Sequence, residues 1–191
     1  MAGGSGDDFY RVDLETDVIH EANDSMSGHD VVTAESSYTL PQGVEDLHLT
    51  GSADLDGTGN ELNNYMGGND GSNILTASSG DDTLNGGDGL DYLFGGLGDD
   101  LFVVNQNYDE VFELNGEGVD TIYTDLDWQL APNTENLFLT GTSPVIGLGT
   151  NTDNYIAGNI AANLIEAYGG NDTLEGGGGS DTLDGLSLIH I

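Results

Sequence analysis

Acidic and amide side chains recur at nine-residue intervals in two stretches of the chain, and they are the residues best placed to do chemistry. Five nine-residue blocks follow one another without insertion from residue 59 to 103, and four more run from 149 to 184. Their sixth positions are Asn64, Asn73, Asp82, Asp91 and Asp100 in the first array, and Asn154, Asn163, Asp172 and Asp181 in the second. Carboxylate and amide oxygens are the ligands that hard divalent cations prefer.

The charge balance makes such a cation necessary. The chain has 35 acidic residues against one basic residue, Arg11, and its net charge is −34. Two carboxylates about 5 Å apart repel each other by roughly 3 kcal/mol at an effective dielectric near 20. Because one arginine cannot neutralise rows of them, the counter-charge must come from solution. The chain contains no cysteine and only four histidines, which disfavours zinc and leads us to predict calcium.

The same nine-residue register predicts the elements that position these side chains. The eighth position is always a large apolar residue, as in Leu84, Leu93 and Ile156, while glycine is frequent at positions one, two and four. Glycine permits turns that other residues resist. We therefore expect each block to form a six-residue turn and a three-residue strand, so that stacked coils bury a thin apolar core. The predicted fold class is all-β.

Two blocks per turn would bring residues 18 apart into neighbouring coils. Asp82 and Asp100 form the only fully acidic pair of this kind, so we predict a calcium site there first and one at Asn73 and Asp91 next. The other pairs join Asn64 with Asp82, Asn154 with Asp172, and Asn163 with Asp181. Carbonyl groups of the glycine turns are expected to complete the sites, at Gly80, Gly87, Gly89, Gly96, Gly98, Gly170 and Gly179. Since asparagine is neutral, we expect the asparagine-led outer coils to be partly metal-free.

Three blocks resemble the RTX, or haemolysin-type calcium-binding, nonapeptide repeat, whose consensus is G-G-x-G-x-D-x-U-x with U a large apolar residue. They read GGDGLDYLF at 86, GGLGDDLFV at 95 and GGGGSDTLD at 176. The resemblance implies a right-handed parallel β-roll with calcium between its turns. It also implies export from a bacterium by a type I secretion system and folding outside the cell, so the expected localisation is extracellular.

A longer duplication overlies the arrays. GGSGDDFYRVD at residue 3 aligns with GGLGDDLFVVN at 95, and VEDLHLTG at 44 aligns with TENLFLTG at 134. The segments between the arrays carry β-rich runs that we interpret as extra strands, and Tyr38 and Trp128 occupy equivalent, packing positions. We divide the chain into the end of an upstream array (1–13), a β-rich segment (14–58), array 1 (59–104), a second β-rich segment (105–148), array 2 (149–185) and a tail (186–191).

The tail reads LSLIHI and resembles a translated sequencing adapter; the alternative is an ordinary apolar terminal strand. With this tail, and with a first block that starts at its glycines, the chain is expected to be a fragment of a larger secreted protein. Any catalytic domain would then lie outside it.

Composition and motifs argue against several other functions. The strong negative charge excludes charge-driven binding to nucleic acid or to anionic membranes, and no apolar run approaches the roughly 20 residues that a membrane helix needs. The run at His20 and Glu21 lacks the second histidine of a zinc protease, and without lysine there is no phosphate-binding P-loop. Asp81 and Asp82 could be viewed as a glycosidase pair, but a structural metal explains the many acidic pairs better. We therefore expect no enzyme.

The predicted function is calcium binding by a structural module that folds when calcium is present and is disordered without it. The alternative is a module that binds or positions polysaccharide, or a cell-surface partner, for an attached secreted enzyme. In that case Tyr92, Phe94 and Asn85, at the outward-facing positions seven and nine, would supply the contacts.

Overall fold

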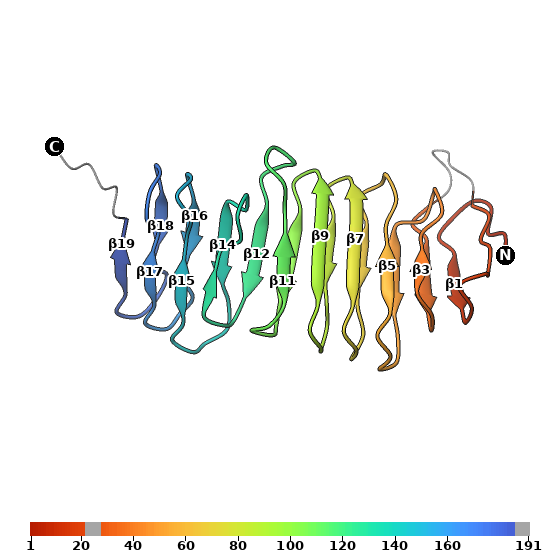
Figure 1. Ribbon diagram of the computed structural model, residues 1–191, viewed down its shortest axis with the longest axis horizontal. Helices are drawn as coiled ribbons and strands as arrows, with labels where there is room; N and C mark the ends of the chain where they lie inside the picture. The colour runs from red at the N-terminus through yellow and green to blue at the C-terminus, as the bar shows by residue number, and fades with distance from the viewer. Residues whose placement is uncertain (22–27, 186–191) are drawn as a thin grey trace.

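The computed structural model describes residues 1–21 and 28–185, and the predicted tail at 186–191 lies outside these residues. The described chain forms a right-handed parallel β-roll of about nine turns, which confirms the predicted fold class. Figure 1 shows the coils stacked side by side along the long axis of the molecule. Within residues 1–21 and 28–185 no helix is long and apolar enough to cross a membrane.

One parallel sheet runs through the whole stack. It contains ten strands, in the order β1 (Phe9–Val12), β2 (Val31–Ala34), β4 (Asp46–Leu49), β6 (Tyr65–Gly67), β8 (Thr83–Asn85), β10 (Leu101–Val104), β12 (Thr121–Thr124), β14 (Asn136–Leu139), β16 (Tyr155–Ala157) and β18 (Thr173–Glu175). Strands from both arrays and from both intervening segments therefore belong to the same sheet.

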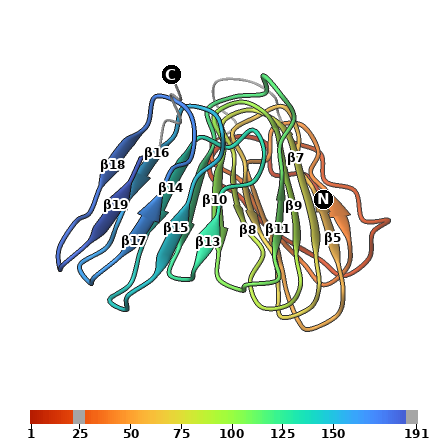
Figure 2. The same ribbon diagram turned by 60° about the vertical axis from the view of Figure 1, so that its left-hand side comes forward.

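The opposite face of the roll is divided into two sheets. The first contains β11 (Glu110–Phe112), β9 (Tyr92–Leu97), β7 (Ile74–Ser79), β5 (Asp56–Thr58) and β3 (Tyr38–Thr39), and the second contains β13 (Trp128–Gln129), β15 (Ile146–Leu148), β17 (Leu164–Glu166) and β19 (Thr182–Asp184). In Figure 2 the strands of the five-stranded sheet lie on one side and those of the four-stranded sheet on the other.

Strand register gives the length of each coil. Inside array 1, Thr83 pairs with Tyr65 and with Leu101, so one coil takes 18 residues. The intervening segment continues the stack with other lengths: Leu101 pairs with Thr121, and Thr121 with Asn136, which are steps of 20 and 15 residues. These segments are thus further coils of the same solenoid, and the division of the chain into six segments stays a prediction.

The core lies between the two faces, and within the arrays position eight supplies its large apolar side chains. Met66, Leu75, Leu84, Leu93, Phe102, Ile156 and Ile165 are completely buried. Burying one such side chain contributes roughly 1.5–3 kcal/mol. Tyr38 belongs to this core and Trp128 packs against it. In the last described coil Leu183 remains 45% exposed, because no later described coil covers it.

Close stacking makes one glycine position a test of the fold. Gly98 has φ +134°, and a Cβ atom there would lie 1.9 Å from the carbonyl oxygen of Gly80 in the preceding coil. Gly116 also has a positive φ, +87°, but a Cβ atom there would meet nothing within 4 Å. We expect Gly98→Ala to lower the free energy of unfolding by about 3 kcal/mol or more, against about 1 kcal/mol for Gly116→Ala.

Urea unfolding of both variants in saturating calcium would measure this difference. Equal losses of stability in the two variants would contradict the close approach of the coils.

Candidate metal centre

The position-six side chains form rows along the turn edges of the roll. The main-chain N–H of Asp82 donates to Oδ1 of Asp100 at 2.8 Å, and that of Asn64 donates to Oδ1 of Asp82 at 2.6 Å. The same bond, at 2.8–2.9 Å, joins three more pairs: Asn73 with Asp91, Asn154 with Asp172, and Asn163 with Asp181. The structure therefore brings together each pair of residues that lie 18 apart in the sequence.

In four of these five aspartates the second carboxylate oxygen is left without a partner. Oδ2 is buried and makes no hydrogen bond within the described part of the chain in Asp82, Asp91, Asp100 and Asp172. Glycine at position one leaves space beside it, since a Cβ atom at Gly86 would lie 2.2 Å from Oδ2 of Asp91. Buried anionic oxygens need a compensating partner, and a calcium ion among these oxygens would supply one. The residues present therefore fit the predicted ion.

Burial also raises the pKa of these carboxyl groups. The pKa of Asp82 and of Asp91 is raised to about 6, and that of Asp100 to about 7, mainly because burial disfavours the charged form. The hydrogen bonds from the main chain lower these pKa values but do not outweigh desolvation, and for Asp100 the neighbouring charges of Asp82 and Asp120 raise the pKa further. In the absence of a cation the rows therefore resist ionisation.

The predicted glycines all occur at sharp turns. Each has a positive φ: Gly80, Gly87, Gly89, Gly96, Gly98, Gly170 and Gly179. Ser78 and Tyr168, which replace glycine at position two, also have positive φ values of 95° and 64°. The turn shape therefore persists without glycine there. The role of the glycine carbonyls as metal ligands stays a prediction.

The asparagine blocks close their turns in another way. Oδ1 of Asn64 accepts from the N–H of Asn60 at 2.8 Å, and Nδ2 of Asn64 donates to the Glu45 carbonyl at 3.0 Å. Nδ2 of Asn60 donates to the carbonyls of Pro41 and Val44 in the preceding coil at 2.8 and 2.7 Å. Amide donors thus tie these coils to their neighbours.

The nine blocks therefore fall into two kinds. Each block forms one half of an 18-residue coil. We call the half-coils that start at residues 59, 68, 149 and 158 asparagine coils, and those that start at 77, 86, 95, 167 and 176 aspartate coils. The same hydrogen bond, from a main-chain N–H to the side-chain oxygen of the position-six asparagine, joins Asn69 to Asn73 and Asn159 to Asn163. In the block that starts at 149, Thr150 replaces the position-two asparagine and its N–H donates to Asn154 Oδ1. Among the nine blocks, positive φ angles occur only in the aspartate coils. The ligand role of Asn64, Asn73, Asn154 and Asn163 stays a prediction.

The rows extend beyond the arrays to residues that the nine-residue register missed. The N–H of Asp100 donates to Oδ1 of Asp120 at 2.9 Å, and that of Asp120 to Oε2 of Glu135 at 2.9 Å. In the first copy of the duplication, the N–H of Asp30 donates to Oε2 of Glu45 at 2.7 Å. The 90-residue offset that aligns VEDLHLTG with TENLFLTG also aligns these two acidic pairs. That alignment was the signal that could have found them.

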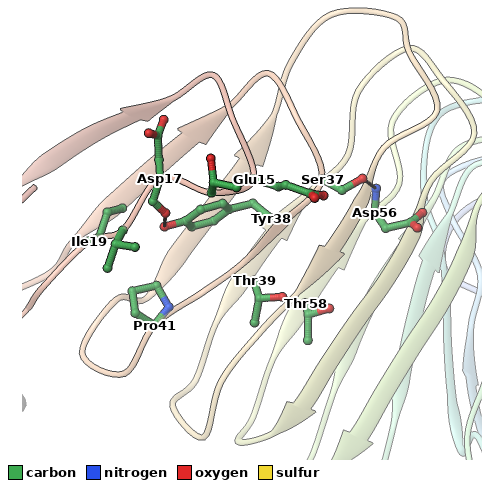
Figure 3. Close-up of a pocket in the computed structure, with 11 residues that line it drawn as sticks. Glu15, Asp17, Ile19, Ser37, Tyr38, Thr39, Pro41, Asp56 and Thr58 are labelled. Carbon is green, nitrogen blue, oxygen red and sulfur yellow. Dashed lines mark hydrogen bonds between the residues drawn. The ribbon is translucent and has the colours of Figure 1, made fainter.

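A pocket beside β3 and β5, shown in Figure 3, is a less suitable candidate site. Within it the Tyr38 hydroxyl donates to the Asp17 carbonyl at 3.3 Å, and the Asp56 N–H donates to Ser37 Oγ at 2.9 Å. Its lining residues include no histidine, cysteine or lysine. Its carboxylates, Glu15, Asp17 and Asp56, are not among the buried oxygens that lack a partner, so the carboxylate rows remain the candidate site.

The raised pKa values predict how the metal-free protein responds to pH. The folded carboxyl groups bind protons more tightly than those of the unfolded chain, which titrate near pH 4. Without metal, the folded state is therefore favoured at low pH, and it loses stability as pH rises from about 4 through about 7. In chelator we therefore expect a folded chain with a thermal transition at about pH 5, and a largely unfolded chain at about pH 8.

Excess calcium should remove or invert this trend, because protons and calcium compete for the same oxygens. Circular dichroism melts over that pH range would measure it. A metal-free protein that gains stability with rising pH would contradict the burial of these acids.

Comparison with known proteins assigns both arrays to one family. Residues 67–102 and 148–183 match the RTX calcium-binding nonapeptide repeat. No curated protein and no solved structure matches the chain. RTX nonapeptide repeats bind Ca²⁺ and serve as structural modules rather than catalytic ones, in agreement with the buried carboxylate rows. The chain therefore contains RTX calcium-binding nonapeptide repeats in both arrays.

Proposed function

We propose that this chain is a calcium-dependent folding and spacer module of a larger, secreted bacterial protein. The observation that carries the proposal is the row of buried carboxylate oxygens without partners in the described residues. Arg11 cannot serve them, because it is exposed and forms an ion pair with Glu35. The cation that neutralises the rows must therefore come from the solvent.

In this proposal several calcium ions bind at the aspartate coils. Their side-chain ligands are Asp82, Asp91 and Asp100 in array 1 and Asp172 and Asp181 in array 2, and turn carbonyls complete the coordination of each ion. The asparagine coils need the ion less, since Asn64 and Asn73 already hold their turns through amide hydrogen bonds. Calcium requirement is thus concentrated in the second part of each array.

The calcium level then acts as the folding switch. An ion that binds only the folded state stabilises it by RT ln(1 + [Ca]/Kd). With dissociation constants of roughly 10⁻⁴ M, millimolar calcium contributes about 1.4 kcal/mol per site, while sub-micromolar calcium contributes almost nothing. The chain would stay unfolded inside the cell, which suits passage through a type I exporter, and would fold outside.

Substitution of one buried aspartate tests the ligand assignment. Asp91→Asn removes a buried carboxylate, whereas the control Asp70→Asn removes an exposed one with the same change of charge. We expect Asp91→Asn to bind about one calcium ion fewer in a calorimetric titration, or to bind it on the order of tenfold more weakly. Asp70→Asn should behave like the unaltered chain.

Circular dichroism of the unaltered chain completes the test. We expect a β-sheet spectrum in about 5 mM calcium and a coil spectrum in excess chelator. A spectrum that does not change with calcium, or equal calcium binding by the two variants, would refute the proposed role.

A second candidate function rests on an aromatic platform on the outer face of the five-stranded sheet. The rings of Phe94 and Phe112 stack with centroids 4.7 Å apart and planes at 11°, and Tyr92 stacks on Phe112 at 6.1 Å. Phe112 is 39% exposed. Exposed stacked rings suit the apolar faces of sugar rings, and the net charge of −34 favours neutral polysaccharides over acidic ones.

Affinity electrophoresis in gels that contain neutral polysaccharides tests this platform. We expect Phe112→Ala to abolish retardation of the calcium-loaded protein, because the ring at the centre of the stack is lost. Phe112→Tyr should keep it, since the ring remains. Retardation that is absent from the unaltered chain, or equal in all three proteins, would exclude the platform as the binding surface.

A further inference from the structure

Three carboxylates meet where array 1 joins the second intervening segment. Asp100 ends the last turn of the array, Glu113 follows β11, and Asp120 precedes β12. One carboxylate oxygen of each lies within 4.8 Å of the others. All three side chains are nearly inaccessible, with exposed fractions of 1%, 6% and 1%. Glu113 and Asp120 lie outside both stretches that match the RTX repeat.

The main chain fixes one oxygen of each carboxylate and leaves the other free. Glu113 Oε1 accepts from the Gly95 N–H at 3.1 Å, Asp100 Oδ1 from the Asp82 N–H at 2.8 Å, and Asp120 Oδ1 from the Asp100 N–H at 2.9 Å. The other oxygen of all three is buried and has no hydrogen-bond partner among the described residues. Three unpartnered anionic oxygens thus share one buried cluster.

The environment opposes three negative charges unless a cation is present. Burial, followed by the charges of Asp120 and Asp100, raises the pKa of Glu113 to about 8. A Cβ atom at Gly95 would lie 2.2 Å from Asp100 Oδ2 and 2.3 Å from Glu113 Oε1. The glycine therefore leaves these two carboxylates room to approach each other.

The internal duplication repeats the cluster. Asp8, Glu21 and Asp30 form the other group of metal-binding geometry in the described residues. They align with Asp100, Glu113 and Asp120 at the same offsets of 92 and 90 residues that relate the two copies. The main-chain N–H of Gly4 donates to Glu21 at 3.1 Å, much as Gly95 donates to Glu113. An arrangement kept in both copies is not an accident of one loop.

The copies differ at one ligand. In the first copy the Tyr10 hydroxyl donates to Glu21 Oε2, whereas the equivalent residue of the second copy is Phe102, which has no hydroxyl. Glu113 Oε2 therefore stays available where Glu21 Oε2 is engaged. The second-copy cluster is the stronger candidate.

We propose that Asp100, Glu113 and Asp120 bind a calcium ion at a site that shares Asp100 with the nonapeptide pattern and adds two acids from outside it. This ion would fasten the second intervening segment onto the end of array 1. An all-oxygen set without cysteine or histidine suits a hard divalent cation. Calcium fits better than magnesium, because magnesium usually keeps several waters and this cluster is buried.

Calorimetric calcium titration of the whole chain tests the site. Glu113→Gln keeps the shape of the side chain and removes its charge, while Glu110→Gln makes the same change at an exposed position of β11. We expect Glu113→Gln to lose one bound ion, or to bind it on the order of tenfold more weakly, and Glu110→Gln to match the unaltered chain.

Stability measurements separate a ligand from a merely structural residue. At calcium concentrations just sufficient to fold the chain, Glu113→Gln should melt at about the same temperature as the unaltered chain, because the site is then largely empty in both proteins. In saturating calcium it should melt at a lower one. Equal ion counts and affinities in the two variants, or the same loss of stability at low and at saturating calcium, would overturn the site.

Terbium binding to the unaltered chain provides a test that needs no altered ligand. Trp128, the only tryptophan, lines the same pocket as Glu113. Terbium in the site should therefore emit when the indole is excited, and Trp128→Phe should lose that emission while it keeps the calcium count. Absence of indole-sensitised emission would refute the site. If Asp91→Asn loses an ion and Glu113→Gln does not, this inference alone fails and the proposed function stands.

Discussion

Repulsion between buried carboxylates in neighbouring coils is the constraint on which the structure depends. Parallel stacking places the N–H of one position-six residue against the carboxylate of the next coil, as between Asp82 and Asp100. That bond engages one oxygen and leaves the other buried and unpartnered. Two such charges about 5 Å apart cost roughly 3 kcal/mol, so a cation between the coils would stabilise their stacking at neutral pH.

In the asparagine coils, amide hydrogen bonds join the stacked turns. An amide offers a donor where a carboxylate offers only acceptors, and Nδ2 of Asn60 and Asn69 donates to carbonyls of the preceding coil. In both arrays the asparagine coils come first and stack on an intervening segment, and the aspartate coils follow. Each array thus begins with coils held by amide hydrogen bonds and continues with coils whose buried carboxylate oxygens lack a partner among the described residues.

The nine-residue register predicted the regular part of this architecture because the same repeat places the apolar residue of each strand and the acidic residue of the turn before it. Leu84 and Leu93 are buried and Asp82 lies next to Asp100, as the 18-residue spacing requires. The intervening coils could not be derived in this way. Glu113 and Asp120 follow Asp100 by 13 and 20 residues, so only the lengths of the loops around β11 and β12 bring them to it.

The intervening coils bury more apolar side chains per strand in the ten-stranded sheet than typical nonapeptide coils do. A nonapeptide strand such as β16 turns a single residue inward, Ile156, whereas the four-residue strands β12 and β14 each turn two inward. Ile122, Leu137 and Leu139 are buried there, and burial contributes about 25 cal/mol per Å² of apolar surface. Because each coil of a solenoid contacts only its neighbours, these coils supply stable surfaces on which the calcium-dependent coils can assemble.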